Sequence, residues 1–128
     1  MTPEEYLAEV KARLATSPVI AQVLNVVEEW SLSDRGYFRA RLTLSNGDFL
    51  EVAEYFVIEG DRNVTRRYRH QWMTADQQTL RKRWDNVEHF PDLPNFPHHV
   101  HIGDNPPVSG QSMSILALLD QLELELLS

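Results

Sequence analysis

Residues 37–58 read YFRARLTLSNGDFLEVAEYFVI, and this stretch decides the fold. Apolar side chains occupy every second position over residues 38–44, and a similar alternation runs over residues 50–58. A period of two residues is typical of a strand that is buried on one face only. The dipeptide Asn46-Gly47 between the two runs is the strongest short signal for a hairpin turn. The sequence therefore predicts an antiparallel hairpin at the centre of the chain.

Further strands extend this hairpin in both directions. After a turn at Gly60-Asp61, residues 64–73 alternate again, and a short strand follows near residues 80–84. On the N-terminal side, residues 19–32 fit helical spacing as well as a strand, and we favour a strand over residues 22–32 because of its β-branched content. The sequence thus predicts a meander of four or five antiparallel strands.

The stretch from Asp85 to Pro107 interrupts the alternation. Five of the seven prolines fall in it, so we predict a long loop without regular structure. Loops of this length inside a compact domain are usually functional or disordered, and the aromatic and histidine content favours an ordered loop.

Helices are expected at both ends of the chain. Thr2 is suited to cap the first helix, Pro3 to its first position, and Pro18 ends it. Residues 109–112 open a second helix, whose apolar residues recur at helical spacing up to Leu127. The predicted fold is therefore α+β, a single domain over residues 1–128 in which an N-terminal and a C-terminal helix flank an antiparallel sheet.

Composition and charge narrow the function. The chain has no cysteine, no signal-peptide pattern and no apolar run long enough to span a membrane, so we expect a cytoplasmic protein without membrane contact. The net charge is −7, yet residues 35–101 hold ten of the twelve basic side chains and all five histidines. This centre either faces an anion or is an ordinary solvated sheet face.

The sharpest motif is the run FPHHVH at residues 96–101. On an extended segment His99 and His101 point to one side and His98 points to the other. Imidazole is both a general base near neutral pH and the commonest metal ligand. A metal site would need a third ligand, for which the sequence offers His89, Asp85 or Asp92. The remaining interpretation is a structural loop whose imidazoles bond to backbone.

Two more motifs carry charged groups that are candidates for catalysis. Arg83 and Asp85 are two residues apart, so they share a face of the strand. Arg83 could then hold a phosphate, and Asp85 could orient Arg83 or a nearby histidine. The alternative is an ordinary salt bridge at the end of a strand. Glu54 falls in phase with the buried positions of its strand. If Glu54 is buried, we expect it to pair with an arginine or to have a raised pKa. The alternative is that the sheet face is exposed at this end of the strand.

One predicted strand alternates basic and aromatic side chains. Guanidinium groups interleaved with rings suit single-stranded RNA, which proteins bind by stacking and phosphate contacts. Aromatic stripes on strands are also common in cores. The candidate substrate-binding residues are Arg66, Arg67, Tyr68, Arg69, His70 and Trp72.

Residues 35–105 resemble the TumE family of small prokaryotic toxins. The resemblance rests on the Asn46-Gly47-Asp48 turn, the Arg66–Trp72 strand, the Arg83–Asn86 element and, most specifically, the run at residues 92–101. The family pattern has Tyr where this chain has Trp84, and often a second histidine where it has Phe90. The resemblance implies a partner antitoxin with a helix-turn-helix domain, encoded next to the toxin, but names no catalytic residue.

The leading hypothesis is a toxin that cleaves RNA without a cofactor. One of His98, His99 and His101 removes the proton of a 2′-hydroxyl, Arg83 stabilises the phosphate charge, and a second histidine or Glu54 protonates the leaving oxygen. Two alternatives stay open: a non-enzymatic protein that binds a partner through its sheet and acidic helices, and a hydrolase that uses a divalent metal. A homodimer is a further partner to test.

Overall fold

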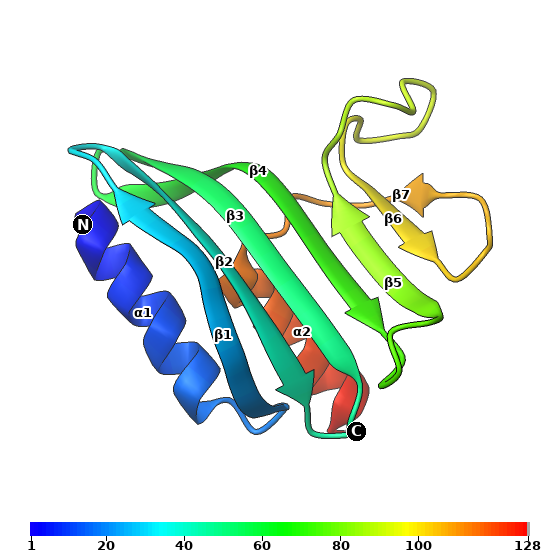
Figure 1. Ribbon diagram of the computed structural model, residues 1–128. Helices are drawn as coiled ribbons and strands as arrows, with labels where there is room; N and C mark the ends of the chain where they lie inside the picture. Colours follow the sequence, from blue (N-terminus) through cyan, green and yellow to red (C-terminus); the bar gives the residue numbers. More distant parts are fainter. Residues whose placement is uncertain (128) are drawn as a thin grey trace.

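The computed structural model describes residues 1–127 (Figure 1). Its elements, in chain order, are α1 (Pro3–Thr16), β1 (Ile20–Ser31), β2 (Arg35–Leu44), β3 (Phe49–Glu59), β4 (Arg62–Met73), β5 (Leu80–Asp85), β6 (His99–Ile102), β7 (Val108–Ser109) and α2 (Ile115–Leu126). The α+β class and the two terminal helices are therefore confirmed.

The sheet is a meander, but it is larger than predicted. Seven strands lie side by side in chain order, and each pairs antiparallel with the next. The prediction of four or five strands was wrong because the proline-rich stretch after Asp85 contributes β6 and leads to β7. A proline removes a donor only at its own position, so the residues between Pro97 and Pro106 are free to pair with β5.

The pairing of β1 with β2 explains why the sequence of β1 fits helical spacing as well as a strand. Ile20, Val23, Val26 and Glu29 pair with buried residues of β2, and a register shift falls after each of the first three. Each shift inserts one extra residue, as a β-bulge does. The positions paired with buried residues of β2 therefore recur every third residue, close to the helical period. The predicted strand is confirmed, with a periodicity that is not the usual two.

Local capping sets where the helices begin and end. The Thr2 hydroxyl accepts a hydrogen bond from the Glu5 N–H, and the Glu5 carboxylate accepts one from the Thr2 N–H, both at 3.1 Å. The predicted cap of α1 is thus confirmed. Helix α2 begins later than expected, because Ser109 pairs in β7 and Ser114 is the residue whose hydroxyl caps the helix.

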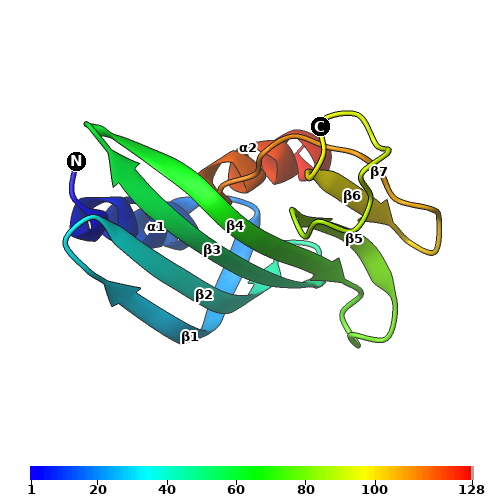
Figure 2. The ribbon, with the colours of Figure 1, turned by 90° about the horizontal axis from the view of Figure 1, so that it is seen from above.

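Both helices pack against the same face of the sheet (Figure 2). We call this the core face; its buried side chains include Phe38, Leu42, Leu50, Phe56 and Trp84. The opposite side, here called the outer face, carries no helix within residues 1–127. Neither helix of this described part is long and apolar enough to cross a membrane.

A buried carboxylate ties the core face together. Glu54 on β3 accepts hydrogen bonds from the Tyr6 hydroxyl of α1 at 2.8 Å and from the backbone N–H of Ile115, the first residue of α2, at 2.9 Å. Asn63 and Thr65 of β4 donate to its other oxygen at 3.2 and 2.7 Å. Burial raises the pKa of Glu54 and these donors oppose that rise, so the group is a structural junction of four elements.

We predict that Glu54→Ala lowers the free energy of unfolding by about 3–5 kcal/mol, because it leaves several buried donors without an acceptor. Urea denaturation measures the change. Glu51→Ala removes a carboxylate from the outer face of the same strand and is the matched control, with an expected loss under about 1 kcal/mol. Equal losses in the two variants would show that Glu54 is not the junction.

Candidate functional site

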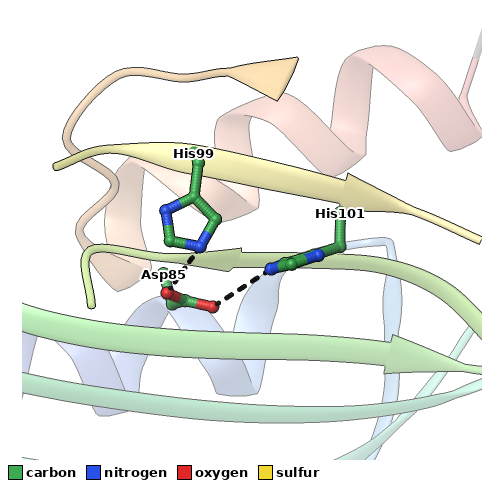
Figure 3. A group of neighbouring side chains, drawn as sticks. All are labelled: Asp85, His99 and His101. Carbon is green, nitrogen blue, oxygen red and sulfur yellow. Dashed lines mark ion pairs between the residues drawn. The ribbon is translucent and has the colours of Figure 1, made fainter. Parts of the chain in front are cut away.

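Strands β5 and β6 place the predicted catalytic groups together on the outer face. Asp85 pairs with His99, and Arg83 pairs with His101, while Trp84 between them turns to the core. Because side chains alternate along a strand, all four polar groups project from the same side of the sheet. Figure 3 shows both imidazoles directed at the Asp85 carboxylate.

The distances define a compact cluster. His99 Nε2 lies 3.0 Å from Asp85 Oδ1, and His101 Nε2 lies 3.9 Å from Asp85 Oδ2. Arg83 Nε lies 3.4 Å from the same Oδ2 and makes no hydrogen bond with any residue of the described chain. The Asp85 and His99 side chains are almost fully buried, whereas His101 retains 18% exposure. His101 is thus the imidazole of the cluster that a ligand can reach.

The surroundings of His99 constrain its protons. Its Nδ1 lies 3.0 Å from the backbone oxygen of Pro97, and its Nε2 faces the Asp85 carboxylate. Both partners are acceptors, so a neutral ring would place one lone pair against an oxygen. A proton shared with the carboxylate, or a bound cation, can lie between Nε2 and Asp85.

The electrostatics of His101 suit a proton acceptor. Burial is the largest cause that lowers its pKa, and the positive charges of Arg83 and Arg69 act in the same direction. Asp85 opposes them. A lowered pKa keeps the imidazole neutral near pH 7, which is the form that takes up a proton.

The same three residues are also a plausible metal-ligand set. One ligand atom from each of Asp85, His99 and His101 lies within 4.8 Å of the others. Two imidazoles and a carboxylate suit zinc, manganese or iron, and the Pro97 contact resembles the backbone bond that commonly orients a ligating histidine. Of the candidate third ligands, the structure groups Asp85 with the histidines, while His89 and Asp92 are exposed outside the group.

Two predicted catalytic residues lie apart from this cluster. Glu54 is buried on the core face, so the structure does not bring it near His101. His98 points away from His99, as predicted, and its Nδ1 lies 2.9 Å from the Tyr68 hydroxyl, which also contacts the backbone oxygen of Gln111 at 3.1 Å. Burial lowers the pKa of His98.

The predicted substrate-binding strand divides between the two faces. Arg66, Arg67 and Arg69 are exposed and line a groove on the outer face. Tyr68, His70 and Trp72 are buried beneath the helices, where His70 Nε2 contacts the backbone oxygen of Met113 at 2.8 Å. The arginines are therefore available to a ligand, but the aromatic residues are not.

Other aromatic residues, which sequence reasoning did not single out, lie on the outer face. Trp30, Tyr37 and Tyr55 line the same groove as the arginines. Phe90 packs edge-on against His99, with ring centroids 4.9 Å apart. The sequence signal for the tyrosines was their place at polar positions of alternating strands, where a large ring is not needed for the core.

Comparison with known proteins gives one match. The model of a family described as Toxin TumE matches residues 10–126. No curated protein and no solved structure matches the chain. The match covers the whole sheet, all of α2 and the second half of α1, and it includes Arg83, Asp85, His99 and His101.

We expect Asp85→Asn to destabilise the fold by about 2–4 kcal/mol, because Arg83 and the two imidazoles would lose the buried carboxylate that they face. Chemical denaturation tests this, with the exposed Asp92→Asn as the control that changes stability by less than about 0.5 kcal/mol. Elemental analysis of the purified protein accompanies it and should find no stoichiometric metal. One zinc or manganese ion per chain would instead assign the cluster to a metal.

Proposed function

The chain belongs to the TumE toxin family, and from this premise we propose that it acts by cleaving RNA at the outer-face cluster of Arg83, Asp85, His99 and His101. The observation that carries the proposal is the partly exposed His101 imidazole, which lies beside a buried carboxylate and an arginine on the sheet face that no helix of residues 1–127 covers. That combination supplies a base and a phosphate-binding group in one place.

In the proposed reaction, His101 removes the proton of a ribose 2′-hydroxyl. The 2′-oxygen forms a bond to the adjacent phosphorus, and the bond from phosphorus to the 5′-oxygen breaks. Arg83, whose side chain keeps 27% exposure while its Nε faces Asp85, stabilises the charge that develops on the phosphate oxygens. The products are a 2′,3′-cyclic phosphate and a 5′-hydroxyl.

The remaining groups position the base rather than react. The buried pair of Asp85 and His99 fixes the carboxylate that faces His101. Glu54 and His98 lie on or toward the core face, so the leaving 5′-oxygen takes its proton from water in the open groove. Arg66, Arg67 and Arg69 hold neighbouring phosphates of the strand.

A metal-dependent hydrolase is the second candidate. It is favoured by the two acceptors around His99 and by the spacing of the three ligand atoms. In that case Asp85, His99 and His101 would hold the ion, which would supply Lewis-acid activation of water or phosphate. His101 would then be a ligand and not the base.

A non-enzymatic toxin that acts by binding a partner is the third candidate. Strand β1 is an edge strand with exposed apolar side chains, among them Val23, Leu24 and Val26. An exposed edge with apolar side chains commonly pairs with another chain. A helix-turn-helix antitoxin or a second copy of this chain are the partners we propose for it.

Induced expression in a host without the antitoxin tests the proposed reaction. Wild type should arrest growth and fragment total RNA, and His101→Ala should do neither while its expression level and melting temperature stay close to those of wild type. The matched control is His89→Ala, an exposed histidine outside the cluster, which should remain toxic. Toxicity of His101→Ala equal to that of wild type, or harmlessness of all three proteins, would refute the proposal.

A further inference from the structure

We propose that Trp30, Tyr37 and Tyr55 form a base-stacking platform that holds single-stranded RNA on the outer face and directs the strand toward His101. This inference rests on the proposed RNA cleavage and deepens it, because it names the form of the substrate and a binding site apart from the reacting groups. In this proposal the bases stack on these three rings and not on the aromatic residues of β4, which are buried.

The platform is a single row across the sheet. Trp30 on β1 pairs with Tyr37 on β2, Tyr37 pairs with Tyr55 on β3, and Tyr55 pairs with Arg67 on β4. Residues directly opposite one another on neighbouring strands project from the same face and lie about 5 Å apart. Three rings and one guanidinium therefore follow one another along a line perpendicular to the strands.

The rings are arranged to receive further planar groups. The Trp30 and Tyr37 centroids lie 6.1 Å apart with planes inclined by 24°, and Trp30 lies 6.3 Å from Tyr55. Trp30 is 37% exposed on the face that no helix covers. Its Nε1 donates to Glu28 at 3.0 Å, and the Tyr55 hydroxyl accepts from Arg35 at 3.0 Å, so both rings are held in place.

The groove that these rings line continues beneath the arginines. The groove is also lined by Arg66, Arg67 and Arg69, and it reaches Asn86, Val87 and Glu88, which follow Asp85 in the chain. Its volume of about 1130 Å³ exceeds the ~300–1,000 Å³ of pockets for a single small molecule, so it suits a chain of linked groups. Among the described residues Arg67 makes no ion pair, which leaves its guanidinium free for a phosphate.

The register gives the path from the platform to the cluster. Arg69, the next outer-face position after Arg67, pairs with Asp85, and Asp85 pairs with His99. With strands about 4.8 Å apart and outer-face positions about 7 Å apart along each strand, His101 is three strands and two outer-face positions away from Tyr55, a distance on the order of 20 Å. A short stretch of a nucleic acid strand spans that distance, with bases on the rings and a phosphate at His101.

Single-stranded RNA is the occupant that this chemistry favours. Of the arginines that line the groove, Arg66 pairs with Glu59, and of its two carboxylates Glu28 is engaged by Trp30. Arg67 and Arg69 are left against Glu88 alone. Base-paired strands keep their bases stacked inside the duplex, so they cannot use exposed rings. Neighbouring rings and guanidinium groups are typical of surfaces that bind unpaired strands.

The test measures binding of a fluorescein-labelled 2′-O-methyl RNA decamer, which lacks the nucleophile and cannot be cut, by fluorescence anisotropy. Trp30→Ala and Tyr37→Ala should each weaken binding at least about fivefold, because stacking on an aromatic side chain is lost. Trp30→Phe should restore most of the affinity. Leu24→Ala, an exposed apolar residue of the same strand outside the groove, should leave it unchanged. The duplex form of the decamer should bind much more weakly than the single strand.

Cleavage of the matching unmodified RNA is measured in parallel and separates the two proposals. Binding that depends on Trp30, without cleavage, would support the platform and refute the ribonuclease. Cleavage with an affinity that neither alanine variant changes would refute the platform alone. Absence of both binding and cleavage would refute both. Equal affinity for duplex and single strand would show that the face binds by charge alone and would also refute the platform.

Discussion

The hydrogen bonds that converge on Glu54 are the constraint on which the structure depends. One carboxylate at the centre of β3 accepts from the hydroxyl of Tyr6 in α1, from Thr65 in β4 and from the first backbone N–H of α2. These bonds fix both helices on the same face of the sheet. The outer face is left without a helix, so the arginines and rings on it are available to a ligand.

Much of the fold could be predicted from the sequence, because local physics determines it. Alternating apolar positions in β2 and β3, the Asn46-Gly47 turn and the Thr2 cap all act within a few residues. The errors arose where tertiary pairing decides. The bulges of β1 gave it a helical period, and β6 is a strand only because β5 offers it an unpaired edge. Such pairing depends on which segments become neighbours and in which register. The apolar pattern of one segment does not show its partner.

In the candidate site, too, local spacing could be predicted from the sequence, and the pairing of distant segments could not. Spacing along a strand predicts that His99 and His101 project from one side of it, and that Arg83 and Asp85 do the same on their strand. The structure brings these two pairs together. Whether Glu54 joins them depends on how distant strands align, and it lies on the other face. Tyr68, His70 and Trp72 are buried, and Tyr37 and Tyr55 are only half-buried, because the helices cover the core face of the sheet and not the outer face.

The central claim is that His101 acts as a base toward a ribose 2′-hydroxyl, and the ends of the cut RNA test it most directly. Purified protein is incubated with a labelled RNA in EDTA, and the termini of the fragments are identified. Attack by the 2′-oxygen should leave 2′,3′-cyclic phosphate and 5′-hydroxyl ends, formed without metal. Fragments with 3′-hydroxyl and 5′-phosphate ends, or no cleavage until zinc or manganese is added, would contradict it.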